Sequence, residues 1–273
     1  MVGSALGQPA TRRDIEFAEV NGRTLRLDCY LPESRTKLAP LVVYVHGGAW
    51  RRGNRKNPPI LPLTQRGYAV ASVDYRLSPE APFPAQVHDI KAAIRFLRGE
   101  AKRFGVDPDR FFIAGSSAGG HLAALVGVTG GVADLEGMVG GYLNVSSRVA
   151  GIVSFFGAAN LSSILKQSTP HGLSVRVPAL ELLFGGAIGA HSVTAKRASP
   201  ISHVDRDDPP LFLLHGDQDY QMPINQSHEL NALYQRHGLT VKFEVLPGAG
   251  HGGTIFYTAN IMDSMAVFLQ ACP

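Results

Sequence analysis

Cysteine, tryptophan and long apolar runs are all scarce in this chain of 273 residues. The two cysteines, Cys29 and Cys272, lie near opposite ends of the sequence. Either they form one bridge that ties the ends together, or they stay as two free or buried thiols, which we expect. No C-x-x-C or H-E-x-x-H spacing occurs, so we expect neither a metal site nor a cofactor. No apolar run approaches the ~20 residues of a membrane-spanning helix, which excludes a membrane span.

An excess of one charge sign is also missing. The net charge is only +4, although the pI is about 9.1. The basic residues are scattered, apart from a cluster at Arg51-Arg52 and Arg55-Lys56 that we expect to be a solvated loop. No basic stripe is interleaved with aromatic residues, so we expect no nucleic-acid partner.

Residues 1–10 hold no charged n-region and no apolar core, so we expect no signal peptide in the chain as given. We therefore expect a soluble protein, cytoplasmic as given or secreted if a leader has been removed. Nothing in the sequence decides the oligomeric state, and a homodimer stays open.

Apolar material is ample, because 45% of the residues are hydrophobic and 18% are charged. This composition fits one globular domain over residues 12–273. Residues 13–31 alternate around Asn21-Gly22 and predict an antiparallel hairpin with an Asn-Gly turn. Continuous apolar runs of the kind found in strands buried on both faces follow at 41–45, 68–73, 111–114, 152–156 and 211–214, with a last strand at 241–246.

Helical patterns lie between these runs. Val87, Ile90, Ile94 and Leu97 follow the spacing of one helix face, and two more helices are predicted at about 226–236 and 255–269. Strands that alternate with helices, over crossovers of more than ten residues, indicate a mostly parallel sheet covered on both faces.

The stretch 158–200 breaks this alternation. It is long, rich in Gly, Ser and Leu, and holds no clear strand. Because so long a structureless connection is uncommon inside a domain, we expect a cap or lid inserted over one edge of the sheet.

The most informative motif is Gly115-Ser116-Ser117-Ala118-Gly119, between an apolar run and the helix-like run 121–125. It is G-x-S-x-G in a strand–turn–helix context, which holds a serine hydroxyl out on a sharp turn. A serine is a poor nucleophile unless a base takes its proton and fixed donors meet the developing oxyanion. We therefore predict Ser117 as the nucleophile, with the base, acid and donors on other loops.

The oxyanion donors are predicted in two places. In the loop that begins at His46, the consecutive glycines Gly47 and Gly48 allow main-chain N–H groups to turn toward a substrate carbonyl. An H-G-G pattern after an early strand supplies the second donor in hydrolases with a nucleophile elbow. The N–H of Ala118, directly after the nucleophile, is the third predicted donor.

The acid and the base follow the last two predicted strands. Asp219, in His215-Gly216-Asp217-Gln218-Asp219, is the predicted acid, with Asp217 as its competitor. His251, in a glycine-rich loop after the final strand, is the predicted base. The order Ser, Asp, His along the chain is the one expected of hydrolases with a nucleophile elbow. His46 and His215 end strands and are expected to make structural hydrogen bonds.

These motifs together resemble the α/β-hydrolase-fold carboxylesterases. Within them the chain is similar to the feruloyl/acetyl-xylan-type esterases and, more distantly, to the hormone-sensitive-lipase family. The resemblance covers about residues 14–268. Its motifs are His46–Trp50, Val73–Glu80, Gly115–Gly120, His215–Asp219 with Met222–Ser227, and Gly250–Gly252. Two positions depart from it: such relatives commonly have Asp at the place of Ser116 and often Gly at the place of Ala49.

The resemblance implies an α/β-hydrolase fold with an N-terminal hairpin and a cap, and a serine esterase with Ser117, Asp219 and His251 as triad. The expected partner is a small-molecule or polysaccharide-linked ester with a short-chain, acetyl or feruloyl group. Trp50 and Phe155 are predicted to bind substrate, with Phe156 as the alternative to Phe155. Two other functions stay open, an arylformamidase or amidase, which shares the H-G-G-x-W loop, and a non-catalytic ligand-binding protein of the same fold.

Overall fold

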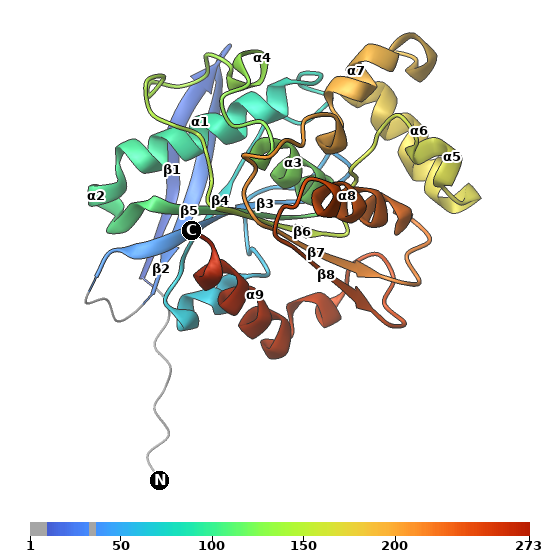
Figure 1. The fold of residues 1–273 in the computed structure, drawn as a ribbon. Coiled ribbons are helices and arrows are strands. Elements are labelled where there is room, and N and C mark those ends of the chain that lie inside the picture. The colour runs from blue at the N-terminus through green and yellow to red at the C-terminus, as the bar shows by residue number, and fades with distance from the viewer. Residues whose placement is uncertain (1–9, 33–36) are drawn as a thin grey trace.

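The computed structural model describes residues 10–32 and 37–273, which form one eight-stranded sheet in the order β1-β2-β4-β3-β5-β6-β7-β8 (Figure 1). The hairpin β1–β2 and the pair β2–β4 are antiparallel, and the other neighbouring strands are parallel. This confirms the predicted hairpin and the mostly parallel sheet. The strands are β1 (Ala10–Val20), β2 (Arg23–Leu31), β3 (Ala39–Val45), β4 (Ala69–Val73), β5 (Val106–Ser116), β6 (Gly151–Phe155), β7 (Leu211–Gly216) and β8 (Val241–Leu246).

The helices confirm the predicted ones in type and differ from them at their ends. The predicted face of α1 is completely buried. The last helix begins at Ala259 rather than Ile255, because residues 254–257 form a separate 3₁₀ turn in which Ile255 is exposed. The helices are α1 (Ala85–Gly99), α2 (Ala101–Phe104), α3 (Ala118–Gly127), α4 (Ala133–Glu136), α5 (Ile164–Gln167), α6 (Pro170–Phe184), α7 (Ser192–Arg197), α8 (Asn225–Arg236) and α9 (Ala259–Ala271). The 3₁₀ turns are η1 (Leu61–Arg66), η2 (Ile188–Ala190), η3 (Pro200–Ser202) and η4 (Thr254–Tyr257).

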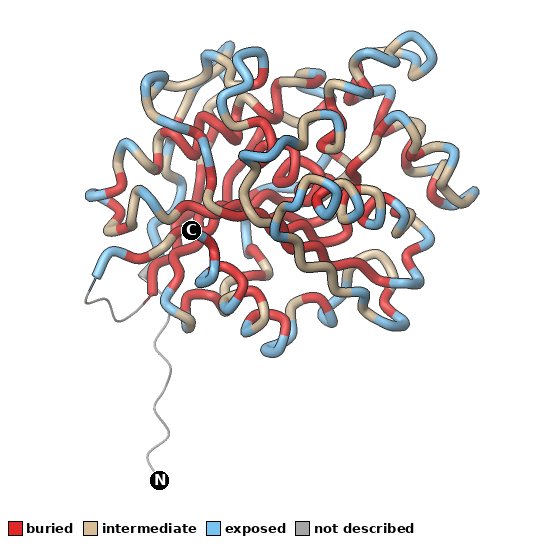
Figure 2. Tube along the Cα trace, viewed as in Figure 1, coloured by how far each residue is buried: buried red, intermediate tan, exposed pale blue. Residues whose placement is uncertain are grey.

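Two apolar cores lie on opposite faces of the sheet. Because side chains alternate along a strand, Val43 and Val45 of β3 pack with residues of α1 and α3, whereas Val42 and Tyr44 pack with residues of α9 and η1. Figure 1 shows α1 and α3 on one side of the sheet and α9 on the other. The buried positions concentrate along the central strands (Figure 2).

The parallel strands bring distant loops to one edge of the sheet. The loops that follow β3, β5, β6, β7 and β8 all leave the carboxyl ends of neighbouring parallel strands. In open α/β sheets this edge is where ligands bind. Each motif singled out in the sequence therefore lies on this edge.

The stretch 158–200 is helical rather than structureless, and it connects the neighbouring strands β6 and β7. Its longest helix, α6, begins with Thr169 as N-cap, whose hydroxyl accepts a hydrogen bond from the N–H of Gly172. The same hydroxyl donates to the carbonyl of Tyr220 at 2.6 Å. This contact fastens α6 to the loop after β7.

The cysteines do not join the ends of the chain. Cys29 is buried in β2, and Cys272, buried after α9, is a free thiol whose Sγ donates to the carbonyl of Phe268. Burial raises the pKa of the Cys272 thiol to about 11. This agrees with the expectation of thiols rather than a bridge.

The prediction of a solvated basic loop is wrong for Arg55, which is buried. Its guanidinium donates to Asp74 at 2.6 Å, to Asp28 at 3.0 Å and to Asp14. Burial by itself would lower the pKa of Arg55, but Asp74 and Asp28 outweigh it and hold the pKa above its ordinary value. The guanidinium thus ties the hairpin, which carries Asp14 and Asp28, to the end of β4.

Replacing Arg55 by alanine is expected to lower the free energy of unfolding by about 3–5 kcal/mol, since Asp28 and Asp74 would be left buried without a counter-charge. Urea titration followed by circular dichroism measures the change. Lys56→Ala removes the neighbouring, exposed charge and should change the same free energy by less than about 0.5 kcal/mol. Equal losses in the two variants would contradict a specific role of the Arg55 ion pairs.

Candidate active site

The turn between β5 and α3 has the geometry of a nucleophile elbow. Ser117 adopts φ 56° and ψ −118°, a conformation that a non-glycine residue rarely holds. A Cβ on Gly119 would lie 2.0 Å from the carbonyl oxygen of Val45, and one on Gly115 would lie 2.2 Å from that of Gly119. The two glycines are therefore required by close backbone contact, and the strained residue between them is the serine.

The three residues predicted as a triad are linked in sequence by two contacts of hydrogen-bonding length. Ser117 Oγ is 2.8 Å from His251 Nε2, and His251 Nδ1 is 2.7 Å from Asp219 Oδ2. They come from the loops after β5, β8 and β7, which the sheet brings to the same edge. This is the connectivity that serine hydrolases use to activate a hydroxyl.

The carboxylate of Asp219 is buried and surrounded by donors. Oδ1 accepts the N–H groups of Gln221 and Met222 at 2.9 and 2.7 Å, and Oδ2 lies 2.7 Å from His251 Nδ1 and 3.3 Å from His215 Nε2. Burial tends to raise the pKa of Asp219, but the hydrogen bonds from His215 and His251 outweigh it and hold the pKa well below its usual range. Asp219 therefore carries a fixed negative charge beside His251.

The competing residues have structural partners instead. Asp217 accepts the N–H of Gly248 at 2.7 Å and so links the loops after β7 and β8. The structural hydrogen bonds predicted for two histidines are confirmed. His215 Nδ1 lies 2.7 Å from the hydroxyl of Ser227, and His46 Nδ1 lies 2.8 Å from the carbonyl of Gly47.

Two of the three predicted oxyanion donors, Gly47 and Ala118, lie beside the nucleophile. A Cβ on Gly47 would lie 3.4 Å from Ser117 Cβ, so the main chain at Gly47 passes directly beside the serine. Gly48 has φ +116°, and a Cβ there would lie 2.0 Å from the carbonyl oxygen of Arg52. Ala118 is the first residue of α3, so its N–H has no acceptor within the helix. Gly47 and Ala118 therefore lie next to Ser117, and the role of all three amides as oxyanion donors remains a prediction.

The aromatic residues differ from the sequence prediction. Trp50 has no exposed surface, and its indole donates to His121 Nδ1 at 3.0 Å. Phe155 is equally buried and packs against Tyr257. Neither side chain reaches an open surface, so their positions do not support the predicted substrate contacts. Phe156 is the aromatic beside the base, with its ring centroid 4.9 Å from that of His251. Its φ of 41° turns it off the strand, which the sequence pattern could not reveal.

Comparison with known families agrees with this geometry. The family model described as BD-FAE matches residues 27–234. The chain belongs to the BD-FAE family. Solved structures are also similar to this chain. One is a truncated carbohydrate esterase from gut microbiota, 32% identical, with a TM-score of 0.89 over 98% of this chain and 97% of that one. The structural match supports the α/β-hydrolase fold, and the matched protein is described as an esterase.

Curated proteins of similar sequence are longer than this BD-FAE chain. The esterase LipC of Mycobacterium tuberculosis is 33% identical over 86% of this chain and 59% of its own length. A probable isoprenylcysteine α-carbonyl methylesterase of Arabidopsis thaliana is 30% identical over 89% of this chain and 51% of its own. The chain thus spans only somewhat more than half the length of these curated relatives. In the part of the BD-FAE chain that the structure describes, no helix is long and apolar enough to cross a membrane.

Ser116, which stands where such relatives commonly have Asp, makes side-chain contacts that the sequence alone does not reveal. Ser116 Oγ lies 2.6 Å from the hydroxyl of Tyr257 and 3.0 Å from that of Tyr44. Tyr257 is in η4, which follows the loop of His251. The chain of three hydroxyls therefore joins the loop of the predicted base to the residue before the predicted nucleophile.

Tyr257→Phe is expected to lower kcat about fivefold with little change in KM, because one hydrogen bond of about 1 kcal/mol no longer holds the His251 loop against the elbow. Steady-state kinetics on a simple ester measures both constants. Tyr44→Phe is the matched control, since it removes the other bond to Ser116 from a residue of β3. A similar fall of kcat in both variants would show that the link to the base loop has no special part.

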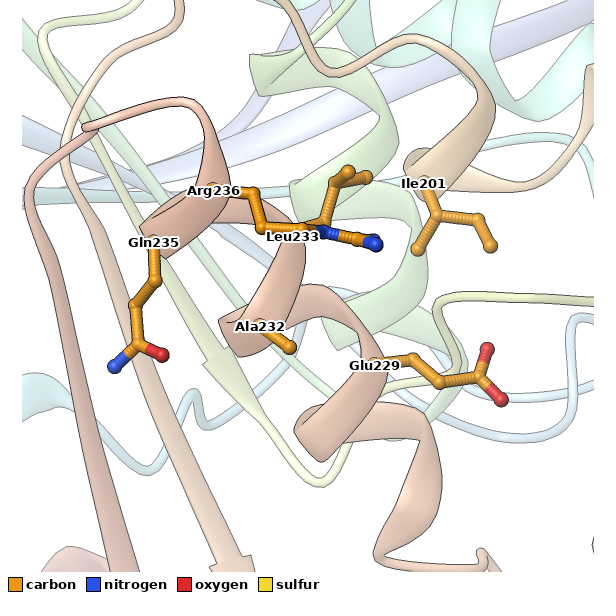
Figure 3. A pocket seen from close by; sticks show the side chains of 6 residues that line it. All are labelled: Ile201, Glu229, Ala232, Leu233, Gln235 and Arg236. Carbon is orange, nitrogen blue, oxygen red and sulfur yellow. The ribbon is translucent and has the colours of Figure 1, made fainter.

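A hollow of about 650 Å³ lies elsewhere on this BD-FAE chain, at the outer side of α8. Figure 3 shows its lining, Ile201 together with residues of α8. The carboxylate of Glu229 there accepts hydrogen bonds from the side-chain amides of Asn160 and Gln167. No residue of the predicted triad lines this hollow, so it is separate from the candidate active site.

Proposed function

We propose that this chain hydrolyses carboxylic esters through an acyl-serine intermediate, with Ser117 as nucleophile, His251 as base and Asp219 as acid. The observation that carries the proposal is the pair of short contacts from Ser117 Oγ to His251 Nε2 and from His251 Nδ1 to Asp219 Oδ2. The esterases among its relatives support the same class of reaction.

In the acylation step, Ser117 Oγ attacks the ester carbonyl carbon while its proton passes to His251 Nε2. The N–H groups of Gly47, Gly48 and Ala118 hold the oxyanion of the tetrahedral intermediate. Its collapse breaks the bond to the alcohol oxygen, which takes the proton from Nε2. Asp219 fixes the tautomer of the imidazole and stabilises the imidazolium that forms. In deacylation, water gives its proton to Nε2 and attacks the acyl carbon, and the proton returns to Ser117 with release of the acid.

The proposed substrates are small to medium acyl or aryl esters with a short-chain, acetyl or feruloyl group. The carbohydrate esterase with which the chain shares 32% identity supports a carbohydrate-linked ester. Phe156 is buried beside His251 and makes the surroundings of the base apolar, which favours an uncharged acyl group. We further propose that residues 158–200 act as the cap of this site, supported by the bond from Thr169 to the loop of Asp219.

A substrate panel tests the proposal. Acetyl, butyryl, octanoyl and feruloyl esters are compared with an N-formyl aryl amide, and release of acid is measured for each. Ester turnover well above that of the amide supports the esterase. The reverse order would make the chain an arylformamidase, which is the alternative that its H-G-G-x-W loop allows. Absence of both activities, together with failure of a fluorophosphonate probe to label Ser117, would show a binding protein.

A further inference from the structure

Arg176 is a buried cation close to the proposed triad that the mechanism does not use. It lies on α6 with only 2% of its surface exposed, and its Nη2 donates to the carbonyl of Gln221, two residues after Asp219. Its charge also contributes to lowering the pKa of His121, one helical turn after Ser117, although burial is the larger cause. The guanidinium therefore lies between α6 and the loop that carries Asp219.

Most of the donors of this guanidinium have no acceptor. Nε is completely buried and makes no hydrogen bond, and Nη1 makes none within the described residues either. Nη1 is not among the fully buried atoms, so it keeps the small exposed surface of the group. No carboxylate among residues 10–32 and 37–273 forms an ion pair with Arg176. A single neutral N–H donor would be enough to bind the carbonyl oxygen of Gln221. Arg176 has five N–H donors and a positive charge, which is more than this one hydrogen bond requires.

The charge on this group is retained at neutral pH. Burial lowers the pKa of Arg176 to about 10, against the opposing effect of Asp219. The carboxylate of Asp219 does not neutralise it by contact, because its oxygens are already engaged by the amides of Gln221 and Met222 and by His251. A buried charge without a partner is unfavourable, and an anion brought by a ligand would offset that cost.

We propose that Arg176 is a specificity-determining residue that binds a carboxylate on the substrate, so that the preferred esters are anionic ones. The carboxylate could belong to the acyl part or to the alcohol part of the ester. In both cases a carboxylate oxygen accepts a hydrogen bond from Nη1 of Arg176. The inference rests on the proposed ester hydrolysis and narrows its substrate class. An arginine suits this task because its donors match carboxylate geometry and its hydrogen bonds to an ion are stronger than neutral ones.

Two matched substrate pairs test the inference on the full chain. In the acyl arm, monomethyl succinate is compared with methyl levulinate, which replaces the carboxylate by a ketone of similar size. In the alcohol arm, 4-acetoxybenzoate is compared with 4-acetoxybenzamide. The measured quantity is the ratio of kcat/KM, anionic over neutral, for the wild type, Arg176→Gln and Arg176→Lys. Fluorophosphonate labelling counts the intact sites in each variant, so that a partly unfolded preparation does not distort the ratio.

We expect the wild type to prefer the anionic ester about tenfold in one arm. Arg176→Gln should lose that preference while its neutral-ester kcat/KM stays within about threefold, and Arg176→Lys should keep part of it. Wild-type ratios near one in both arms, or a ratio unchanged by Arg176→Gln, would overturn the inference while the neutral esters still support ester hydrolysis. Absence of turnover with every ester would overturn the proposed function and this inference with it.

Discussion

Replacing Ser117 by alanine is expected to lower kcat for ester hydrolysis by about 10⁶-fold, the loss seen when a triad nucleophile is removed. The methyl group of alanine cannot attack a carbonyl, and no other hydroxyl approaches His251 Nε2 among the described contacts. What activity survives should come from the oxyanion donors and from substrate binding. Kinetics on a short-chain aryl ester, corrected for spontaneous hydrolysis, measures the change.

The matched control is Ser174→Ala, which removes an exposed hydroxyl on α6 that bonds only its own helix. This variant should keep wild-type kcat and full fluorophosphonate labelling, whereas Ser117→Ala should lose both. If Ser117→Ala keeps most of its esterase activity, the nucleophile is another residue and the proposed mechanism fails.

Asp219→Asn should give the second largest effect, a fall of kcat of about 10⁴-fold. The carboxylate accepts N–H groups on both oxygens, so the NH₂ group of an asparagine would have to face a donor. The Nδ1–H of His251 would lose the carboxylate oxygen that accepts its hydrogen bond. The imidazole would then no longer be held in the tautomer that leaves Nε2 free to take the proton of Ser117. Pre-steady-state measurement of acylation separates this loss from any effect on substrate binding.

Asp217→Asn tests the choice between the two carboxylates of the same loop. Among residues 10–32 and 37–273, the side chain of Asp217 accepts one hydrogen bond, from the N–H of Gly248, and an amide oxygen can accept the same bond. Its kcat should therefore change by less than about threefold. A large loss in Asp217→Asn with a small one in Asp219→Asn would reverse the assignment of the acid.

The elements with regular apolar patterns were predictable from the sequence. The alternation around Asn21-Gly22 has one interpretation, a hairpin, and the continuous runs at 41–45 and 211–214 are long enough only for buried strands. The order of Ser117, Asp219 and His251 also required no structure, since each follows a strand. The parallel sheet does the rest, because it brings the carboxyl ends of its strands to one edge.

The features that the sequence did not reveal depend on contacts between distant positions. Arg55 sits in a loop that reads as exposed, and only the fold brings Asp14, Asp28 and Asp74 around it. The helix α6 contains Gly172 and Pro178, which weaken its pattern. Phe156, which contacts His251, has a left-handed backbone conformation that cannot be predicted from the residue types in this stretch.

The position of each strand in the sheet gives the three members of the proposed triad unequal support. Ser117 follows β5, which is paired on both sides in the middle of the sheet, whereas His251 follows β8, an edge strand whose residues are all partly or fully exposed. Local opening starts where few buried contacts hold a segment, so the outer strand separates from its neighbour more readily than the centre does. The base can therefore leave the nucleophile while the strained serine turn is still intact. Loss of catalytic competence on warming would then be reversible at first, and would become permanent only when the middle of the sheet opens.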